Sequence, residues 1–227
     1  MNPKLQSYLV ESYIACLSLC ICPRDHFGPE TYPLGKIGIS LRDGKKRGLR
    51  NISGYFVFLN LEADTYSVRI ETDYYFAKNF DVIIPSYSSP PGGFIPSDDE
   101  DVQLMDYKGV LVATVNLRPN PAYPFPGGSS LIRGIVYDAA ANPVPDAVVS
   151  VLGKPIANKT TKNGEFVLYF TELTGADIQK VNGRKFIKGN GSQEIRIQAE
   201  HPALGVSQPF PLQLEEGTTA SGSIFYS

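Results

Sequence analysis

The stretch 131–170, LIRGIVYDAAANPVPDAVVSVLGKPIANKTTKNGEFVLYF, determines the fold. Three runs rich in Val, Ile, Tyr and Phe predict β-strands at Leu131–Tyr137, Ala147–Leu152 and Glu165–Phe170. The boundaries between these runs carry Gly, Pro, Asn and Asp, which form turns. Asn163-Gly164 predicts a tight hairpin, because these residue types adopt positive φ at low cost. No part of the stretch has the helical spacing of apolar residues, so we expect it to be all-β.

An earlier part of the chain repeats this pattern. Leu17–Leu59 matches Leu131–Phe170, with Ser53-Gly54-Tyr55-Phe56 in the place of Asn163-Gly164-Glu165-Phe166. Three later pairs follow in the same order: Tyr66–Thr72 with Glu194–Glu200, Phe80–Ile84 with Phe210–Leu214, and Leu111–Leu117 with Ala220–Tyr226. Similarity in a constant order indicates a duplicated domain, and it predicts Gly54 and Gly164 at equivalent hairpin turns.

The second copy resembles the carboxypeptidase regulatory-like domain, a transthyretin-like β-sandwich. The resemblance lies in a strand followed by Asp138, Pro143-Val144, Ala147-Val148-Val149 and Asn163-Gly164-Glu165-Phe166. The first copy resembles the same family but has no clear counterpart of Pro143-Val144. The resemblance implies an all-β chain of two tandem Greek-key β-sandwiches of this type. We expect an N-terminal extension (1–14), a first sandwich (15–118), a Pro-rich linker (119–129) and a second sandwich (130–227).

Composition excludes several classes of partner. The net charge is -2 with both signs mixed, and the pI is about 5.7, so the basic surface needed for nucleic acid is missing. The 18 Pro and 21 Gly residues favour short strands and many turns. The longest apolar run near the N-terminus, Tyr13–Cys22, is too short to span a bilayer as a helix. We therefore expect neither nucleic-acid binding nor membrane insertion.

The same run, YIACLSLCIC, resembles the core of a signal peptide, but Glu11 interrupts it and only one basic residue precedes it. The alternative, which we favour, is a first strand at Ala15–Cys22 with Leu17, Leu19 and Ile21 buried. Without an export signal the protein is expected to be cytoplasmic, where it could join a particle that is released later.

The three cysteines alternate with aliphatic residues, so on a strand Cys16, Cys20 and Cys22 lie on one face. A Cys20–Cys22 disulfide is implausible, because the side chains of residues i and i+2 on a strand are too far apart. With two histidines in the whole chain, a zinc site is also unlikely. Free thiols in a reducing compartment are the expected state, with no metal and no cofactor.

Catalytic motifs are missing from the sequence. There is no Gly-x-Ser-x-Gly motif and no phosphate-binding glycine loop. The transthyretin fold includes hydroxyisourate hydrolase, which uses paired histidines, an arginine and a C-terminal Tyr-Arg-Gly-Ser. This chain ends in Ile224-Phe225-Tyr226-Ser227 instead. The acidic run Asp98–Asp101 does not have the spacing of a calcium-binding EF-hand loop. We therefore predict no catalytic, cofactor-binding or metal-binding residues, and no enzyme.

Two insertions interrupt the sandwich pattern. By composition Ser86–Asp101 is a surface loop, and Glu172–Gln193 has room for one helical turn and a small hairpin. Long loops of this kind often carry binding sites.

The linker sequence LRPNPAYPFPGG (117–128) contains four prolines, which favour extended and semi-rigid backbone. We expect Tyr123 and Phe125 to act as a wedge between the sandwiches. The linker and the paired domains resemble accessory proteins of phage-tail-like contractile injection systems. That resemblance implies a structural subunit at a cap, collar or baseplate, with other protein subunits as partners.

The C-terminal strand Ala220–Tyr226 has neither charge nor proline, so it can accept a strand from a partner if it lies at a sheet edge. The alternative, which we favour, is an interior strand of its own sandwich. The candidate interface is Tyr123, Phe125, Ile224, Phe225 and Tyr226. The alternative function is a carbohydrate-binding or adhesin-like module, in which loop aromatics contact the ligand: Tyr74, Tyr75, Phe76, Tyr87, Phe94 and Tyr123.

Overall fold

A computed structural model describes residues 15–28, 32–41, 44–86, 93–95, 97–189, 192 and 194–226. Within these ranges the regular structure is almost entirely β, with a single 3-10 turn, η1, at Gly175–Asp177. None of the described helical structure is long and apolar enough to cross a membrane. The prediction of an all-β, multi-sheet sandwich protein is confirmed.

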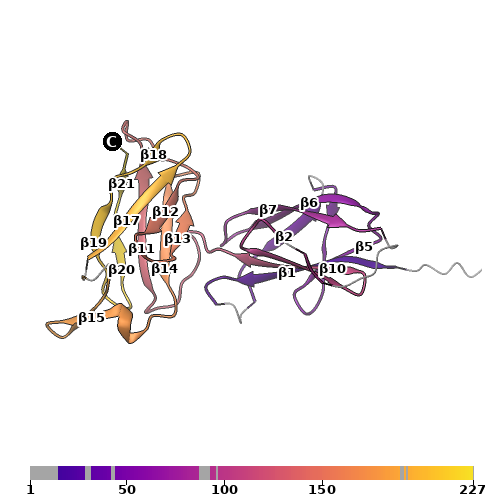
Figure 1. The fold of residues 1–227 in the computed structure, drawn as a ribbon, viewed down its shortest axis with the longest axis horizontal. Coiled ribbons are helices and arrows are strands. Elements are labelled where there is room, and N and C mark those ends of the chain that lie inside the picture. The colour runs from indigo at the N-terminus through magenta and orange to yellow at the C-terminus, as the bar shows by residue number, and fades with distance from the viewer. Residues whose placement is uncertain are drawn as a thin grey trace, which may run out of the picture. The chain divides into compact units, whose positions relative to one another are not determined.

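Figure 1 shows strands in both halves of the chain. The strands of the first half are β1 (Leu17–Asp25), β2 (Ile37–Leu41), β3 (Lys46–Arg47), β4 (Leu49–Arg50), β5 (Phe56–Leu59), β6 (Asp64–Thr72), β7 (Lys78–Ile84), β8 (Gly93–Ile95), β9 (Val102–Tyr107) and β10 (Val110–Leu117). Those of the second half are β11 (Ser130–Tyr137), β12 (Val148–Val151), β13 (Ala157–Lys159), β14 (Glu165–Phe170), β15 (Ile178–Val181), β16 (Arg184–Ile187), β17 (Glu194–His201), β18 (Gly205–Val206), β19 (Phe210–Gln213), β20 (Thr219–Ser221) and β21 (Ile224–Phe225).

Both halves have the same sheet connectivity, as expected for a duplication. In the first half β5, β1 and β10 are neighbours in one sheet, and β2, β6 and β7 are neighbours in another. In the second half β14, β11 and β20 correspond to the first group, and β12, β17 and β19 to the second. The matching order follows the sequence alignment strand by strand, which supports the internal repeat.

The second half has one continuous core between its two sheets. It is formed by β11 and β14 on one side and by β12 and β17 on the other, and its members include Ile132, Leu168, Val149 and Ile195. Alternate residues of each strand point into this core, which is why apolar residues recur at every second position. The first half follows the same rule, with Val68 and Ile70 of β6 buried.

Strand β14 departs from this alternation because both of its faces are covered. Phe166, Leu168 and Phe170 lie in the core, while Val167 and Tyr169 pack on the opposite face with Leu131 and the partly buried Phe27 and Phe125. A strand that is covered on both faces has a continuous run of apolar residues in its sequence. The run FVLYF is therefore explained by a second, smaller cluster outside the sandwich core.

Strand β1 confirms part of the prediction for the first strand. Leu19 and Ile21 are fully buried, but Leu17 is 37% exposed, so its predicted burial is wrong. The reason is a register shift against β5 between Leu17 and Leu19, which interrupts the alternation of faces. Cys16 is exposed, Cys20 half-buried and Cys22 buried, and none of the three forms a disulfide.

The turns at Gly54 and Gly164 have the same hydrogen bonds. In the first, the Gly54 N–H donates to the Asn51 carbonyl (3.1 Å) and the Asn51 N–H to the Tyr55 carbonyl (2.8 Å). In the second, Gly164 donates to Thr161 (2.8 Å) and Thr161 to Glu165 (2.8 Å). The glycines have φ of 81° and 72°, so each closes a three-residue loop of the same kind. The predicted equivalence of the two turns is confirmed.

The insertions contain more strand than their composition suggests. Ser86–Asp101 was expected to be a loop, but Gly93–Ile95 within it forms β8, which pairs with β9. Residues 87–92 and 96 lie outside the described ranges. The two strands extend the first sheet beyond β10, in the order β10-β9-β8. Pairing between backbone groups, which composition does not reveal, stabilises this edge.

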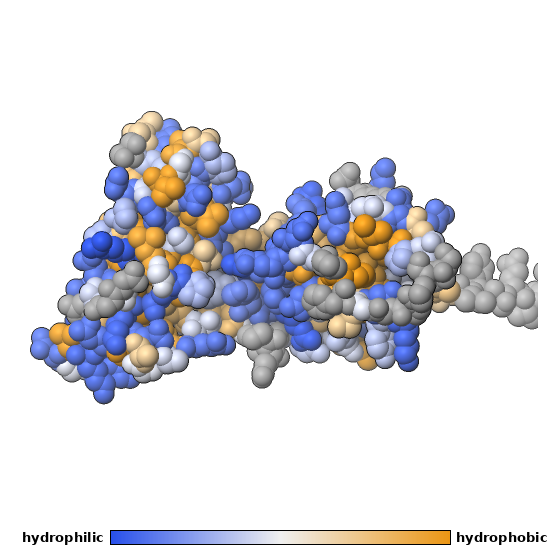
Figure 2. All heavy atoms as spheres, viewed as in Figure 1, coloured by the Kyte–Doolittle hydropathy of each residue, from blue (hydrophilic) through white to orange (hydrophobic). Residues whose placement is uncertain are grey.

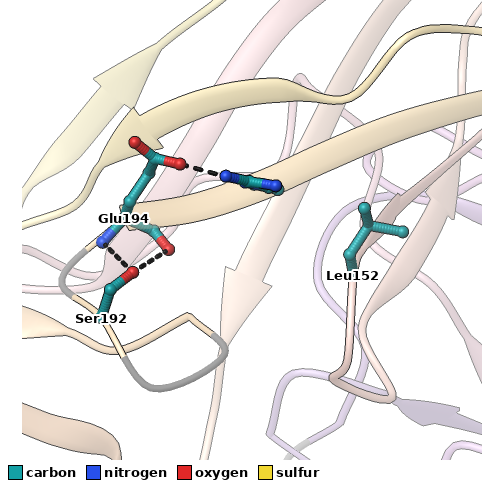
Figure 3. Close-up of a pocket in the computed structure, with 4 residues that line it drawn as sticks. Leu152, Ser192 and Glu194 are labelled. Carbon is teal, nitrogen blue, oxygen red and sulfur yellow. Dashed lines mark hydrogen bonds and ion pairs between the residues drawn. The ribbon is translucent and has the colours of Figure 1, made fainter.

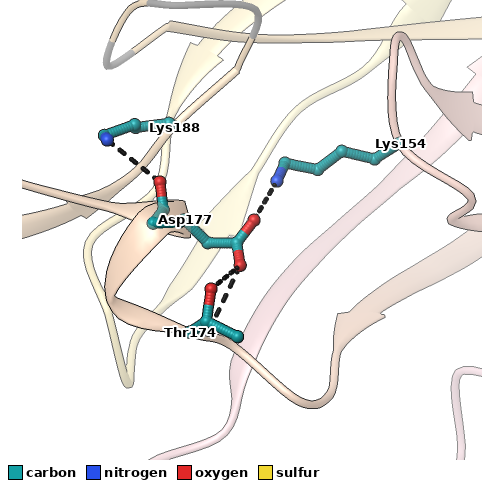
Figure 4. Close-up of polar contacts among 5 residues, drawn as sticks. Lys154, Thr174, Asp177 and Lys188 are labelled. Carbon is teal, nitrogen blue, oxygen red and sulfur yellow. Dashed lines mark hydrogen bonds and ion pairs between the residues drawn. The ribbon is translucent and has the colours of Figure 1, made fainter.

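The second insertion forms the predicted helical turn and hairpin. Asn182 and Gly183 have φ of 50° and 81° and connect β15 to β16 in a two-residue turn. At η1 the Asp177 carboxylate accepts hydrogen bonds from the Thr174 hydroxyl (2.7 Å) and the Lys154 ammonium (2.8 Å), as Figure 4 shows. The Lys188 N–H donates to the Asp177 carbonyl (2.8 Å). The Lys154 hydrogen bond, with those from Thr174, holds the pKa of Asp177 well below its usual range.

By its contacts the chain divides into two compact units that do not follow the boundaries of the repeat. Unit 2 comprises Pro23–Gly38, Ile70–Lys78 and Asn116–Ser227, and unit 1 the remaining residues. The Pro-rich segment therefore belongs to unit 2. It is not extended throughout, because the Tyr123 N–H donates to the Asn120 carbonyl (3.0 Å) and closes a turn. The boundaries expected at 118 and 130 stay a prediction.

Candidate protein-contact edge

Strands β20 and β21 form one continuous ladder beside β11. Thr219 is opposite Leu131 and Ser221 opposite Arg133, and farther along Ile224 is opposite Val136, all in parallel register. The Gly222 N–H donates to the Arg133 carbonyl (2.9 Å). The two short strands are therefore one strand, interrupted at Gly222.

The other side of this strand is uncovered in the part of the chain that the structure describes. Hydrogen-bonding groups of successive strand residues alternate between the two edges. Since Gly222 and Tyr226 donate to β11, Thr219, Ser221 and Phe225 turn their amides away from it. Among the described strands β11 alone pairs with β20 and β21, and Thr219, Ser221 and Phe225 are all exposed. The strand is an open edge, so of the two alternatives the edge position is the one found.

The predicted interface residues of this strand are divided between its two faces. Ile224 and Tyr226 are buried in the core, so their side chains are not available to a partner. Phe225 is 57% exposed and stacks on Tyr137, with ring centroids 5.1 Å apart. Of the three, Phe225 alone presents its side chain to solvent. Its stacking partner Tyr137 was not among the residues predicted from the sequence.

The corresponding edge of the first half is covered. Strand β10 is the counterpart of β20 and β21. It pairs on one side with β1, which is the counterpart of β11, and on the other side with β9. The β9 pairing is antiparallel and runs from Val110 opposite Tyr107 to Val115 opposite Val102. In the second half only five residues separate β19 from β20, so the chain has no local segment to take the place of β9.

The other two predicted interface residues lie inside unit 2. The Tyr123 hydroxyl donates to the Asp25 carboxylate (2.6 Å), which also accepts from the Tyr75 hydroxyl (3.0 Å). Asp25 is fully buried and Tyr123 is 5% exposed. Burial raises the pKa of both tyrosines, and the Asp25 carboxylate raises it further. This network could not be predicted from the sequence, because its members are far apart along the chain.

Phe125 joins an aromatic cluster in the same unit. Its ring centroid lies 4.7 Å from that of Tyr123, 5.1 Å from that of Phe27 and 5.6 Å from that of Tyr169. Arg133 lies over the same ring at 5.5 Å. Such contacts add about 0.5–1.5 kcal/mol per aromatic pair to the stability gained from burial. In unit 2 both linker aromatics therefore stabilise the fold.

None of the loop aromatics predicted for carbohydrate binding is exposed among those whose side chains the structure describes. Tyr75 and Tyr123 are buried, and Tyr74 and Phe76 are half-buried. Tyr87 and the side chain of Phe94 lie outside what the structure describes. Figure 2 shows apolar residues reaching the surface in both halves, bordered by polar ones.

A small pocket in the second half is lined by Leu152, Ser192, Glu194 and Arg196 (Figure 3). The Arg196 guanidinium donates to the Glu194 carboxylate (3.0 Å), and the Ser192 hydroxyl is engaged with the backbone of Glu194. These groups satisfy one another and include no activated nucleophile. Across the described ranges no three His, Cys, Asp or Glu residues are placed to hold a metal ion.

The fold and this edge define an all-β, multi-sheet sandwich protein whose β20 and β21 lie at an uncovered sheet edge. No family model matches the chain, and no curated protein is significantly similar to it. The resemblance to the carboxypeptidase regulatory-like family therefore stays a prediction.

Solved structures give distant similarities. These include the Bacillus anthracis TIE protein (12% identity, 93% of this chain and 34% of that chain, TM-score 0.29). The C-terminal fragment of the pilus adhesin SpaC from Lactobacillus rhamnosus GG has 10% identity over 92% of this chain and 97% of that chain (TM-score 0.30). The major pilin subunit BcpA of Bacillus cereus has 8% identity over 93% and 99% (TM-score 0.24). The chain spans about a third of the TIE protein. TM-scores this low assign the chain to no family and no function.

Proposed function

We propose that the protein is a non-enzymatic structural subunit that contacts other protein subunits of a larger assembly. The observation that carries the proposal is the open edge at β20 and β21. No described strand pairs with its outward side, and the strand has neither charge nor proline to discourage pairing. Exposed Phe225 on Tyr137 adds apolar area next to the unpaired amides. Strand addition combines these two sources of affinity.

The assembly we propose is a phage-tail-like contractile injection particle, built in the cytoplasm, in which the chain is an accessory subunit of the cap, collar or baseplate. The support for this narrower role is the sequence of the Pro-rich segment and its likeness to linkers of such proteins. A tail-like particle is constructed from repeated protein contacts, for which a rigid β-sandwich with an open edge is suited.

The test compares Phe225→Lys with Val206→Lys in tagged protein made at its natural level. Both side chains are 57% exposed, so the two substitutions introduce the same charge at equally accessible sites, one on β21 and one on β18. We expect the wild type and Val206→Lys to elute in a large complex with defined protein partners, and Phe225→Lys to elute alone with an unchanged melting temperature. If Phe225→Lys still enters the complex, or if the wild type is a free glycan-binding monomer, the proposal is wrong.

A further inference from the structure

We infer that the partner strand at this edge is supplied by a second copy of the chain, whose β20 and β21 pair antiparallel with their own counterparts about a twofold axis. This inference rests on the proposed function and names the partner of the same edge. The first half indicates the direction of pairing, since the strand that covers β10 runs antiparallel to it.

The register follows from the positions of the outward amides. Alternation places them at Thr219, Ser221, Ser223 and Phe225, because Gly222 and Tyr226 donate to β11. In one register all four outward amides form hydrogen bonds with the second copy, and the twofold axis then lies beside Gly222. It sets Thr219 opposite Phe225 of the second copy and Ser221 opposite Ser223. Two identical strands related by a twofold axis are antiparallel, so the contact is self-complementary and closed.

The composition of the strand fits pairing with itself. In a twofold ladder a charged residue close to the axis would lie near its own copy, and like charges in neighbouring positions repel. Residues 217–227, GTTASGSIFYS, contain no charged residue and no proline. Three other edge strands of similar or greater length carry a charge or a proline: β19 contains Pro211, β13 contains Lys159, and β7 contains Lys78 and Asp81.

The side chains next to the edge agree with this arrangement. Thr219, Ser221 and Phe225 alternate with the inward Ala220 and Ile224, so they lie together on the outer face of the sheet. The twofold axis moves the exposed Phe225 of each copy next to the small Thr219 of the other. Each Phe225–Tyr137 stack then has an apolar neighbour from the second copy, which reduces its exposure to water.

The experiment is sedimentation equilibrium of residues 1–227 over a wide range of concentration, because a ladder this short predicts a weak dimer. One variant carries Ser221→Lys with Ser223→Lys, and a second carries Ser221→Glu with Ser223→Glu. A dimer of either variant with itself has like charges directly opposite one another. A dimer that contains one copy of each variant has Lys opposite Glu. The matched control, Leu204→Lys with Val206→Lys, places two positive charges at exposed positions at or next to β18.

We expect the wild type and the control to dimerise. Each charged variant should dissociate with a dissociation constant raised roughly tenfold or more, and an equimolar mixture should recover dimers. A wild type that stays monomeric, charged variants that still dimerise, or a mixture that stays monomeric would each overturn the inference. Equal melting temperatures show that the variants are folded. The purified chain could be monomeric while the Phe225→Lys variant is lost from the native complex. In that case the self-pairing is wrong and the proposed function stands.

Discussion

A β-carbon added to Gly134 would lie 1.6 Å from the carbonyl oxygen of Gly222. The backbones of β11 and of the C-terminal strand are therefore in closer contact here than any side chain allows. The interruption between β20 and β21 falls at this contact, where two glycines from opposite ends of the second half meet.

We predict that Gly134→Ala displaces the C-terminal strand. Backbone cannot move aside as a flexible side chain does, so we expect a loss of about 2–3 kcal/mol in the free energy of unfolding. Denaturant unfolding measures the loss, and hydrogen exchange should show faster exchange of the Gly222 and Tyr226 amides. Gly175→Ala is the control, since nothing lies within 4 Å of its added β-carbon. Similar stability for the two variants would contradict the close contact.

The Gly164 turn gives a second comparison. Gly164 and Gly109 both have positive φ, but a β-carbon at Gly164 would lie 2.7 Å from the Val136 carbonyl oxygen, whereas Gly109 has nothing within 4 Å. Gly109→Ala should cost about 1 kcal/mol from backbone strain alone. Gly164→Ala should cost clearly more, because steric overlap adds to the strain. Thermal unfolding of both variants measures the difference, and equal losses would show that the turn has room for a side chain.

The buried carboxylate of Asp25 should be important for the stability of unit 2. Asp25→Ala leaves the hydroxyls of Tyr75 and Tyr123 without their acceptor, at a cost of about 1–3 kcal/mol for each. Tyr123→Phe removes one donor and should cost less, about 1 kcal/mol. Chemical denaturation of the two variants tests this order. If Tyr123→Phe is as damaging as Asp25→Ala, the network is not what stabilises this part of the unit.

The same tyrosines predict a loss of stability in alkali. Their folded-state pKa is raised above the ordinary value of 10.0, foremost by burial. Stability from the neutral hydroxyls is therefore fully present below pH 10 and falls as the pH rises above it. In a titration with alkali, we expect part of the rise in tyrosinate absorbance to appear only when the protein unfolds. The variant Tyr123→Phe should reduce that part of the rise. Titration of all tyrosines in the folded protein around pH 10 would contradict the prediction.

Sequence reasoning was most successful where local chemistry decides the structure. The boundaries of β14 and the turns at Gly54, Gly164 and Asn182-Gly183 follow from β-propensity and from the residues that tolerate positive φ. The repeat then predicted which strands of the two halves correspond, because both copies have the same pattern of strands and turns. These features depend on residues close together in the chain.

Sequence reasoning failed where long-range contacts decide. The burial of Tyr123 depends on Asp25, 98 residues away, and that of Ile224 depends on pairing with β11. The exposure of Leu17 depends on one register shift against β5. Of the candidate interface, Phe225 alone stays a proposed contact residue, and its neighbour Tyr137 comes from the structure alone.

The central claim is that a strand from another chain covers the edge at β20 and β21. Amide hydrogen exchange of Thr219, Ser221 and Phe225 tests it most directly, measured in dilute free protein and in the native assembly. We predict fast exchange in the free protein and strong protection of these three amides in the assembly, with Gly222 and Tyr226 protected in both states. Equally fast exchange of Thr219, Ser221 and Phe225 in the assembly would contradict the account.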